Sequence, residues 1–318
     1  MPRAALALVA LLLATSPAHS FPTKPIRLVV ASTAGSSLDI PARLVAERLR
    51  DKLPQPIVVE NRAGAGGTLA VAETARAAPD GHTLALGFNG PLAYAPFLYS
   101  KLPYDPLKDL APVILMGGQP FVLGVDANAG VANVRELVAL WRKNPGRYNY
   151  SSLGNGSGSH LSMELLKSLE KLYAVHIPYA GGPAAAQAVA TGEVSASFLP
   201  ASVFIPHVQA GRVKLLAVST RERWNLLSEL PSVAEAGVRE FHADGWNGIV
   251  APAGTPREVI LTLNRAINAV LEMPEVRERL AKSQIRIGGG PPEALGTLMQ
   301  EEPKTWGAII RYTGAKLD

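Results

Sequence analysis

The chain has 318 residues, of which 47% are hydrophobic and 18% charged, and its formal net charge is +5 at pH 7. These proportions are typical of globular proteins, exclude collagen-like and low-complexity classes, and leave room for two hydrophobic cores. The basic residues are scattered and cysteine is absent, which argues against a nucleic-acid partner and excludes disulfides, thiolate metal sites, cysteine nucleophiles and cysteine lipid anchors.

The first twenty residues have the pattern of a secretory signal peptide. A short positive start precedes an apolar run at residues 4–14, which is too short to span a bilayer comfortably. Ala18 and Ser20 have the small-residue spacing of a cleavage site. We therefore predict a signal peptide over residues 1–20, a mature chain that starts near Phe21, and a periplasmic protein. A buried N-terminal helix is the less favoured alternative.

The first regular elements after this segment are a strand and a helix joined by small residues. The strand is predicted over 26–30, and the helix places Ile40, Leu44 and Leu49 near one face. Asp39 lies in its first turn, where the helix dipole favours a carboxylate. The loop between strand and helix leaves backbone N–H groups at the positive end of a helix, which suits an anion.

The next strands are predicted over 57–59 and 83–86, with a helix over 68–77 between them. The glycines at 64–67 invite a dinucleotide interpretation. However, the third glycine of G-x-G-x-x-G would fall on Leu69, and the loop follows the second strand instead of the first. We therefore favour a glycine-rich loop shaped to a cleft.

A second set of strand–helix units begins with a helix predicted over 134–143. Its central feature is Ser151–His160, S-S-L-G-N-G-S-G-S-H, which lies between a short strand at 148–150 and an amphipathic run at 161–169. This loop contains no lysine or arginine, so an anion here would be held by neutral donors. The alternative is that its serines and glycines serve only as helix caps. Two such loops, one in each lobe, can face each other across a cleft.

The remaining pattern completes an α/β fold with mainly parallel sheets flanked by helices. A strand-rich run over 113–125 is a candidate for a crossing between lobes. Another strand is predicted over 249–251, and Thr255 with Pro256 marks the start of the helix that follows. The C-terminal helices are expected to return to the first lobe, so that two crossings form a hinge.

Ordered matches over nearly all of the mature chain give it a family resemblance. They include P-I-R-L-V-V at 25–30, V-E-N-R-A-G-A-G-G at 59–67, G-N-G-S-G-S-H-L at 154–161 and A-P-A-G-T-P at 251–256. The chain resembles the Bug-type receptors of tripartite tricarboxylate transporters. The resemblance implies a two-lobed periplasmic binding protein fold of the second type, with the ligand cleft between the lobes. Residues 21–124 with 245–318 are the expected first lobe, which is discontinuous, and 125–244 the second.

The resemblance also implies the function and the site. Such receptors close on a small carboxylate and deliver it to the membrane permease subunits of the transporter, with no cofactor and no chemistry, and we expect a monomer. In the family two loops grip the carboxylate, mainly through backbone N–H groups and hydroxyls. The matching residues are Ala34, Gly35, Ser36 and Asp39 in the first lobe and Ser151, Asn155, Gly156, Ser157 and Ser159 in the second.

Several positions depart from the family pattern. Ser32 and Ser36 stand where an aromatic residue and a second glycine are usual, and residues 198–202 lack a frequent acid. Leu199 falls in that stretch and suggests a more apolar distal pocket, so we add it to the predicted ligand-binding residues. These departures favour a monocarboxylate with an apolar or aromatic body.

Three alternatives to a transport receptor are a hydrolase, a metal site and a ligand sensor. A hydrolase built on Asp39, Ser157 and His160 is disfavoured, because neither loop contains a G-x-S-x-G elbow. A metal shared by His160 and Glu164 is disfavoured because no further ligand cluster is visible. We therefore predict neither catalytic residues nor a metal site. A ligand sensor that docks on a signalling partner instead of a permease remains the alternative.

Overall fold

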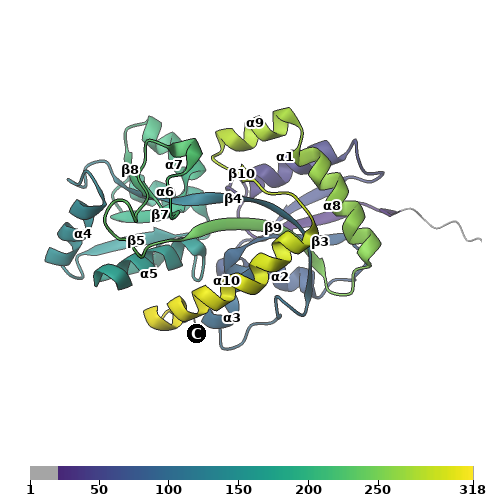
Figure 1. The fold of residues 1–318 in the computed structure, drawn as a ribbon, viewed down its shortest axis with the longest axis horizontal. Coiled ribbons are helices and arrows are strands. Elements are labelled where there is room, and N and C mark those ends of the chain that lie inside the picture. The colour runs from purple at the N-terminus through teal and green to yellow at the C-terminus, as the bar shows by residue number, and fades with distance from the viewer. Residues whose placement is uncertain (1–20, 318) are drawn as a thin grey trace, which may run out of the picture.

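The computed structural model describes residues 21–317, so the predicted signal peptide lies outside the described residues. Two groups of parallel strands with covering helices are joined by two long strands that run through the centre of the molecule (Figure 1). The arrangement agrees with the two-lobed α/β fold predicted from the sequence. No helix in the described range is long and apolar enough to cross a membrane.

The first lobe is built on three short parallel strands. The strand β1 lies between β2 and β3, and the helices α1, α2 and α8 contact this sheet or one another. A single hydrophobic cluster joins α1 and α8 to the strands. The bounds of these elements are β1 (Ile26–Val30), α1 (Asp39–Leu49), β2 (Ile57–Asn61), α2 (Thr68–Ala75), β3 (Thr83–Phe88) and α8 (Arg257–Leu271).

The second lobe repeats this construction around β5, which pairs in parallel with β6 and β7. Its helix α4 has the bounds predicted from the sequence, and Asn133 caps it by accepting the Glu136 amide. The bounds are α4 (Val134–Lys143), β5 (Tyr148–Ser152), α5 (Gly158–Glu170), β6 (Ala174–Pro178), α6 (Gly182–Ala190), β7 (Ala196–Pro200), α7 (Ala201–Gln209), β8 (Val213–Val218) and the 3-10 turn η3 (Asn225–Leu227).

The two crossing strands are β4 (Leu110–Asp126) and β9 (Asp244–Pro252). They pair with each other, and every antiparallel pairing among the described strands involves one of them. The predicted run at 113–125 lies within β4. The parallel strands of each lobe therefore continue into one sheet through a two-stranded connection.

The remaining elements lie near this connection. The longest helix, α10, packs against β4 and η2 and also against α5 of the second lobe. Figure 1 shows it running beside the crossing strands. The bounds are the 3-10 turn η1 (Ala65–Gly67), the π-helical turn η2 (Gly90–Tyr94), α3 (Ala95–Leu98), α9 (Pro274–Lys282), β10 (Arg286–Ile287) and α10 (Pro292–Thr313).

One sequence prediction about a helix is wrong in detail, and a second holds without the expected hydroxyl cap. Ile40 is 46% exposed, because the buried positions Ala42, Val45 and Leu49 define a face of α1 about half a turn away from it. Thr255 does not cap α8. Its hydroxyl donates to the Pro252 carbonyl at 2.7 Å and closes the preceding turn instead.

Candidate functional site

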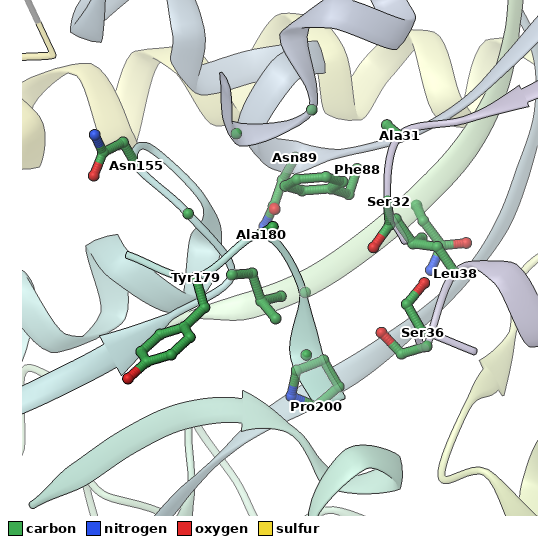
Figure 2. A pocket seen from close by; sticks show the side chains of 18 of the residues that line it. Ala31, Ser32, Ser36, Leu38, Phe88, Asn89, Asn155, Tyr179, Ala180 and Pro200 are labelled. Atoms are coloured by element: carbon green, nitrogen blue, oxygen red, sulfur yellow. The ribbon is translucent and has the colours of Figure 1, made fainter. Parts of the chain in front are cut away.

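A cavity of about 460 Å³ lies between the lobes. Figure 2 shows Ser32, Ser36 and Leu38 on one side of it and Asn155 and Tyr179 on the opposite side. No charged side chain and no histidine is among the described residues that line it. The polar side chains in the lining are those of Ser32, Ser36, Ser37, Asn89, Tyr99, Gln119, Asn155, Tyr179, Trp246 and Asn247.

Several helices begin at this cavity, among them α1, α2 and α6. Residues 36–38 precede α1, residues 64–67 precede α2, and Gly182 is the first residue of α6, and all of them line the cavity. Because the backbone N–H groups at a helix start lack partners within the helix, each start carries partial positive charge. Of these three starts, two come from the first lobe and one from the second. A small anion between them would be attracted from both sides without a charged side chain.

Asp39 fixes the loop between β1 and α1 without lining the cavity. Its carboxylate accepts the Gly35 amide at 2.9 Å, Arg43 Nε at 3.0 Å and Asn61 Nδ2 at 2.8 Å. Burial alone would raise the pKa of Asp39, but these hydrogen bonds lower it below its usual value. The ionised carboxylate therefore holds the turn that presents Ser36.

Ser36 is 2% exposed and lines the cavity. Its hydroxyl oxygen accepts the Asp39 amide at 3.2 Å. Since that bond uses a lone pair, the hydroxyl proton remains available as a donor. Among the predicted residues of this loop, Ala34 and Gly35 do not line the cavity, whereas Ser32 and Ser37 do.

The loop before α5 is held together by its own hydroxyl groups. Ser157 caps the helix by accepting the His160 amide at 3.2 Å, and it donates to the Gly154 carbonyl at 2.7 Å. Ser152 Oγ bonds both the amide and the carbonyl of Gly154, each at 3.1 Å. These serines are therefore occupied within the loop, and Leu153, Gly154 and Asn155 form its face toward the cavity.

The side chains of two stacked histidines contact polar groups of this loop. The rings of His160 and His176 lie 3.9 Å apart, His160 Nδ1 accepts the Gly156 amide at 3.2 Å, and His176 Nε2 lies 2.6 Å from Ser152 Oγ. Burial lowers the pKa of His160 to about 4 and that of His176 to about 3. Both rings are therefore neutral near pH 7, which His160 requires in order to accept a hydrogen bond at Nδ1.

Glu164 lies 3.9 Å from His160 Nε2 and has two closer partners. It accepts Lys167 Nζ at 2.6 Å and the hydroxyl of Tyr150. No group of His, Asp and Glu side chains in residues 21–317 could hold a metal ion.

The other predicted residues of the second lobe lie behind the cavity wall. Ser151 donates to the Ala185 carbonyl at 3.0 Å, and Ser159 donates to the Phe198 carbonyl. Leu199 is fully buried in the core of this lobe. Because successive side chains of a strand point to opposite faces, it is the next residue, Pro200, that reaches the cavity. Of all the predicted ligand-binding residues, Ser36 and Asn155 line the cavity.

The crossing strands contribute lining residues that were not predicted as site residues. Gln119 and Phe121 come from β4, and Trp246 and Asn247 from β9. Gln119 is 6% exposed, and its Oε1 has no hydrogen-bond partner within the described chain. A buried acceptor without a partner is costly, so it marks a place where a ligand or water is expected. The signal was present in the sequence, because a lone glutamine interrupts an apolar strand.

Glycines allow the two lobes to come into close contact beside the cavity. Gly66 lies so close to the Asn155 carbonyl oxygen that a β-carbon on Gly66 would overlap it. Gly66 also has a φ of +61°, which glycine adopts without strain. A similar overlap would occur between a β-carbon on Gly181 and the side chain of Thr33. The lobes are therefore closed on each other, and glycine permits the approach.

Two partly buried carboxyl groups, those of Asp244 and Glu302, lie near the residues that line the cavity. Asn89, which lines the cavity, donates to the Tyr94 hydroxyl and to the Asp244 carbonyl, each at 3.0 Å. Tyr94 in turn donates to Glu302 at 2.6 Å. Burial raises the pKa of both Asp244 and Glu302. This shift favours their neutral forms and limits the negative charge beside a site suited to anions.

Comparisons with known proteins agree with this geometry. A family model described as the tripartite tricarboxylate transporter family receptor matches residues 41–315. Protein BugT of Bordetella pertussis is 34% identical over 301 residues, which cover 94% of this chain and 92% of BugT.

Solved structures are similar over the same range. An R. palustris protein solved with adipate has a TM-score of 0.89 and 33% identity, covering 92% of this chain and 98% of its own. MatC from Rhodopseudomonas palustris with bound malate has a TM-score of 0.87 and 33% identity, covering 91% and 100%. The periplasmic binding protein BugD has a TM-score of 0.87 and 29% identity, covering 93% and 99%.

Proposed function

Since the chain belongs to the tripartite tricarboxylate transporter family of receptors, a family of binding proteins and not of enzymes, we propose that it captures a small carboxylate in the periplasm. It then delivers the carboxylate to the membrane permease subunits of a tripartite transporter. Residues 1–20 direct its export and are removed.

Three helix starts around one uncharged cavity carry this proposal. A carboxylate placed between α1, α2 and α6 would accept hydrogen bonds from backbone amides and from the hydroxyl of Ser36. No buried ion pair would have to be broken when the ligand leaves. A receptor that must hand its ligand on is better served by such a site than by an arginine clamp.

The ligand enters and leaves by a hinge motion about β4 and β9. Gly66 and Asn155 come from opposite lobes, line the cavity and lie in close contact, so separation of the lobes at this contact would widen access for a ligand. A bound ligand that contacts both lobes favours the closed arrangement by its differential affinity for it.

The body of the ligand is apolar. The hydroxyls of Ser32 and Ser36 lie at one side of the cavity (Figure 2). Apolar surface comes from Phe88, Phe121, Leu153, Pro200 and Trp246. Relatives of this chain were solved with adipate and with malate. For this chain the lining favours a carboxylate on an aliphatic or aromatic body over a polyhydroxylated acid.

A thermal-shift panel tests the proposal. The protein is first freed of any co-purified ligand by unfolding and refolding. Adipate, malate and benzoate are then compared with the uncharged control adipamide. A ligand of the folded state raises the melting temperature, so at least one carboxylate should produce a shift that adipamide does not. If adipamide and the carboxylates gave the same result, the anion site would be refuted.

A further inference from the structure

The chain turns back on itself after its last helix and returns to the cavity. Gly314 ends α10 in the left-handed conformation, with φ +69°, and its amide bonds the Arg311 carbonyl. This reversal directs residues 315–317 away from the helix axis. Ala315 and Leu317 are partly buried against the main hydrophobic cluster, whereas Lys316 is exposed.

Leu317 contacts both lobes at once. Its amide donates to the Leu98 carbonyl at 3.0 Å, which ties it to α3 of the first lobe. Its side chain lies 2.9 Å from the position that a β-carbon on Gly156 would occupy, so it packs directly on the backbone of the second-lobe loop. Leu98 approaches the same position at 2.7 Å. Gly156 is thus enclosed between two leucines of the opposite lobe.

Leu317 also lines the cavity, together with Gly154 and Asn155 of that loop. The family model matches residues 41–315, so Leu317 lies outside the matched residues.

We propose that residues 314–317 form a strap that clamps the loop at 153–157 to the first lobe, and that Leu317 limits the size of the ligand. The proposal rests on the proposed function for its ligand and on the contacts of Leu317 for its mechanism. When the lobes separate, Leu317 stays with Leu98 and Gly156 moves away. The contact therefore exists only in the closed arrangement, where it slows ligand release and narrows the cavity.

The first test needs no ligand. Hydrogen–deuterium exchange is measured on the full chain for the wild type, Leu317→Ala, Leu317→Met and the matched control Lys316→Ala. In Leu317→Ala the amides of residues 153–157 should exchange about tenfold faster, because local opening loses a packing contact. Leu317→Met should restore slow exchange, and Lys316→Ala should match the wild type. Unchanged exchange in Leu317→Ala at an unchanged melting temperature would overturn the clamp.

The second test measures ligand size with benzoate and biphenyl-4-carboxylate as probes. Removal of the leucine side chain enlarges the cavity, so the ratio of the Kd for the large probe to that for benzoate should fall about tenfold in Leu317→Ala. It should stay unchanged in Lys316→Ala. An unchanged ratio in Leu317→Ala would contradict the size limit. If neither carboxylate bound any variant, the proposed function would be weakened, while the exchange comparison would still decide whether the strap exists.

Discussion

The loop before α1 and the loop before α5 look alike in sequence but are built in opposite ways. The first is anchored by the ionised carboxylate of Asp39 and leaves the hydroxyl of Ser36 facing the cavity. The second is anchored by neutral groups, and its hydroxyls on Ser152 and Ser157 are consumed by the loop itself. A serine near a helix start can therefore be a ligand donor or a scaffold, and its partners decide which.

Among the expected effects, the largest is a loss of stability on acidification, which should act through the loop before α5 and not through the loop before α1. The folded-state pKa values of His160 and His176, about 4 and about 3, lie below the usual 6.5. The unfolded chain therefore takes up protons first as the pH falls below 6.5, and the native state loses stability down to about pH 4. We expect the free energy of unfolding to fall by on the order of 2 to 4 kcal/mol between pH 7 and pH 5.

Urea unfolding at the two pH values measures this loss. His176→Gln should reduce the pH dependence, since it removes one of the two buried imidazoles. Asp39, with its lowered pKa, keeps its charge over this range, so the first loop should keep its anchor. If the wild type and His176→Gln lost the same free energy of unfolding between pH 7 and pH 5, His176 would not be held neutral in the folded protein.

Gly66→Ala should prevent closure. The new β-carbon would overlap the Asn155 carbonyl oxygen, a backbone atom that cannot move aside cheaply. We expect carboxylate affinity to fall about 100-fold, because the closed state is the binding-competent one. Gly130→Ala is the matched control. Gly130 has a similar φ of +69° but no atom within 4 Å of the new carbon. Equal affinities for the two variants would contradict closure at this contact.

Asp39→Ala should destabilise the first loop. Its removal leaves the Gly35 amide without its acceptor and leaves Asn61 Nδ2 with the Ser32 carbonyl alone. We expect a loss of about 2 kcal/mol in the free energy of unfolding, measured by urea denaturation at pH 7. Arg43→Ala serves as the comparison. The side chain of Arg43 is half exposed, so its loss should cost less. If Arg43→Ala lost more free energy of unfolding than Asp39→Ala, Asp39 would not be the main anchor of this loop.

Ser36→Ala and Ser157→Ala should separate the two roles of serine with the smallest effects. Ser36→Ala should weaken carboxylate binding about tenfold with little change in stability, because it removes a donor at the cavity. Ser157→Ala should lower stability by about 1 kcal/mol, because it removes the cap of α5. Titration calorimetry and urea unfolding of both variants measure the contrast. If carboxylate affinity fell by the same factor in both variants, the two serines would not have the different roles assigned to them.

Local sequence patterns predicted much of the fold. The bounds of α4, the strand β1 and the strand–loop–helix units at both loops follow from periodicity and capping residues that act within a few positions. The family resemblance placed Ser36 and Asn155, which line the cavity, among the expected ligand-binding residues; local patterns did not. They could not separate these two residues from Ser151 and Ser159, because that depends on hydrogen bonds to strands and helices far along the chain.

The rest of the cavity depends on contacts between distant segments. Gln119 and Asn247 line the same cavity because β4 and β9 pair across the molecule. Leu317 reaches Gly156 because α10, which precedes it, packs against the second lobe. No local motif encodes such approaches. Thr255 and Pro256 precede α8 as the sequence predicts, but the Thr255 hydroxyl bonds the preceding turn and Pro256 is the N-cap.

A crystal structure of the protein with the carboxylate that gives the largest thermal shift tests the central claim most directly. We predict that the carboxylate lies between the starts of α1, α2 and α6, accepts a hydrogen bond from Ser36 Oγ, and has no charged side chain within about 4 Å. A carboxylate paired with an arginine or lysine, or bound outside this cavity, would contradict the account of an anion held by neutral donors.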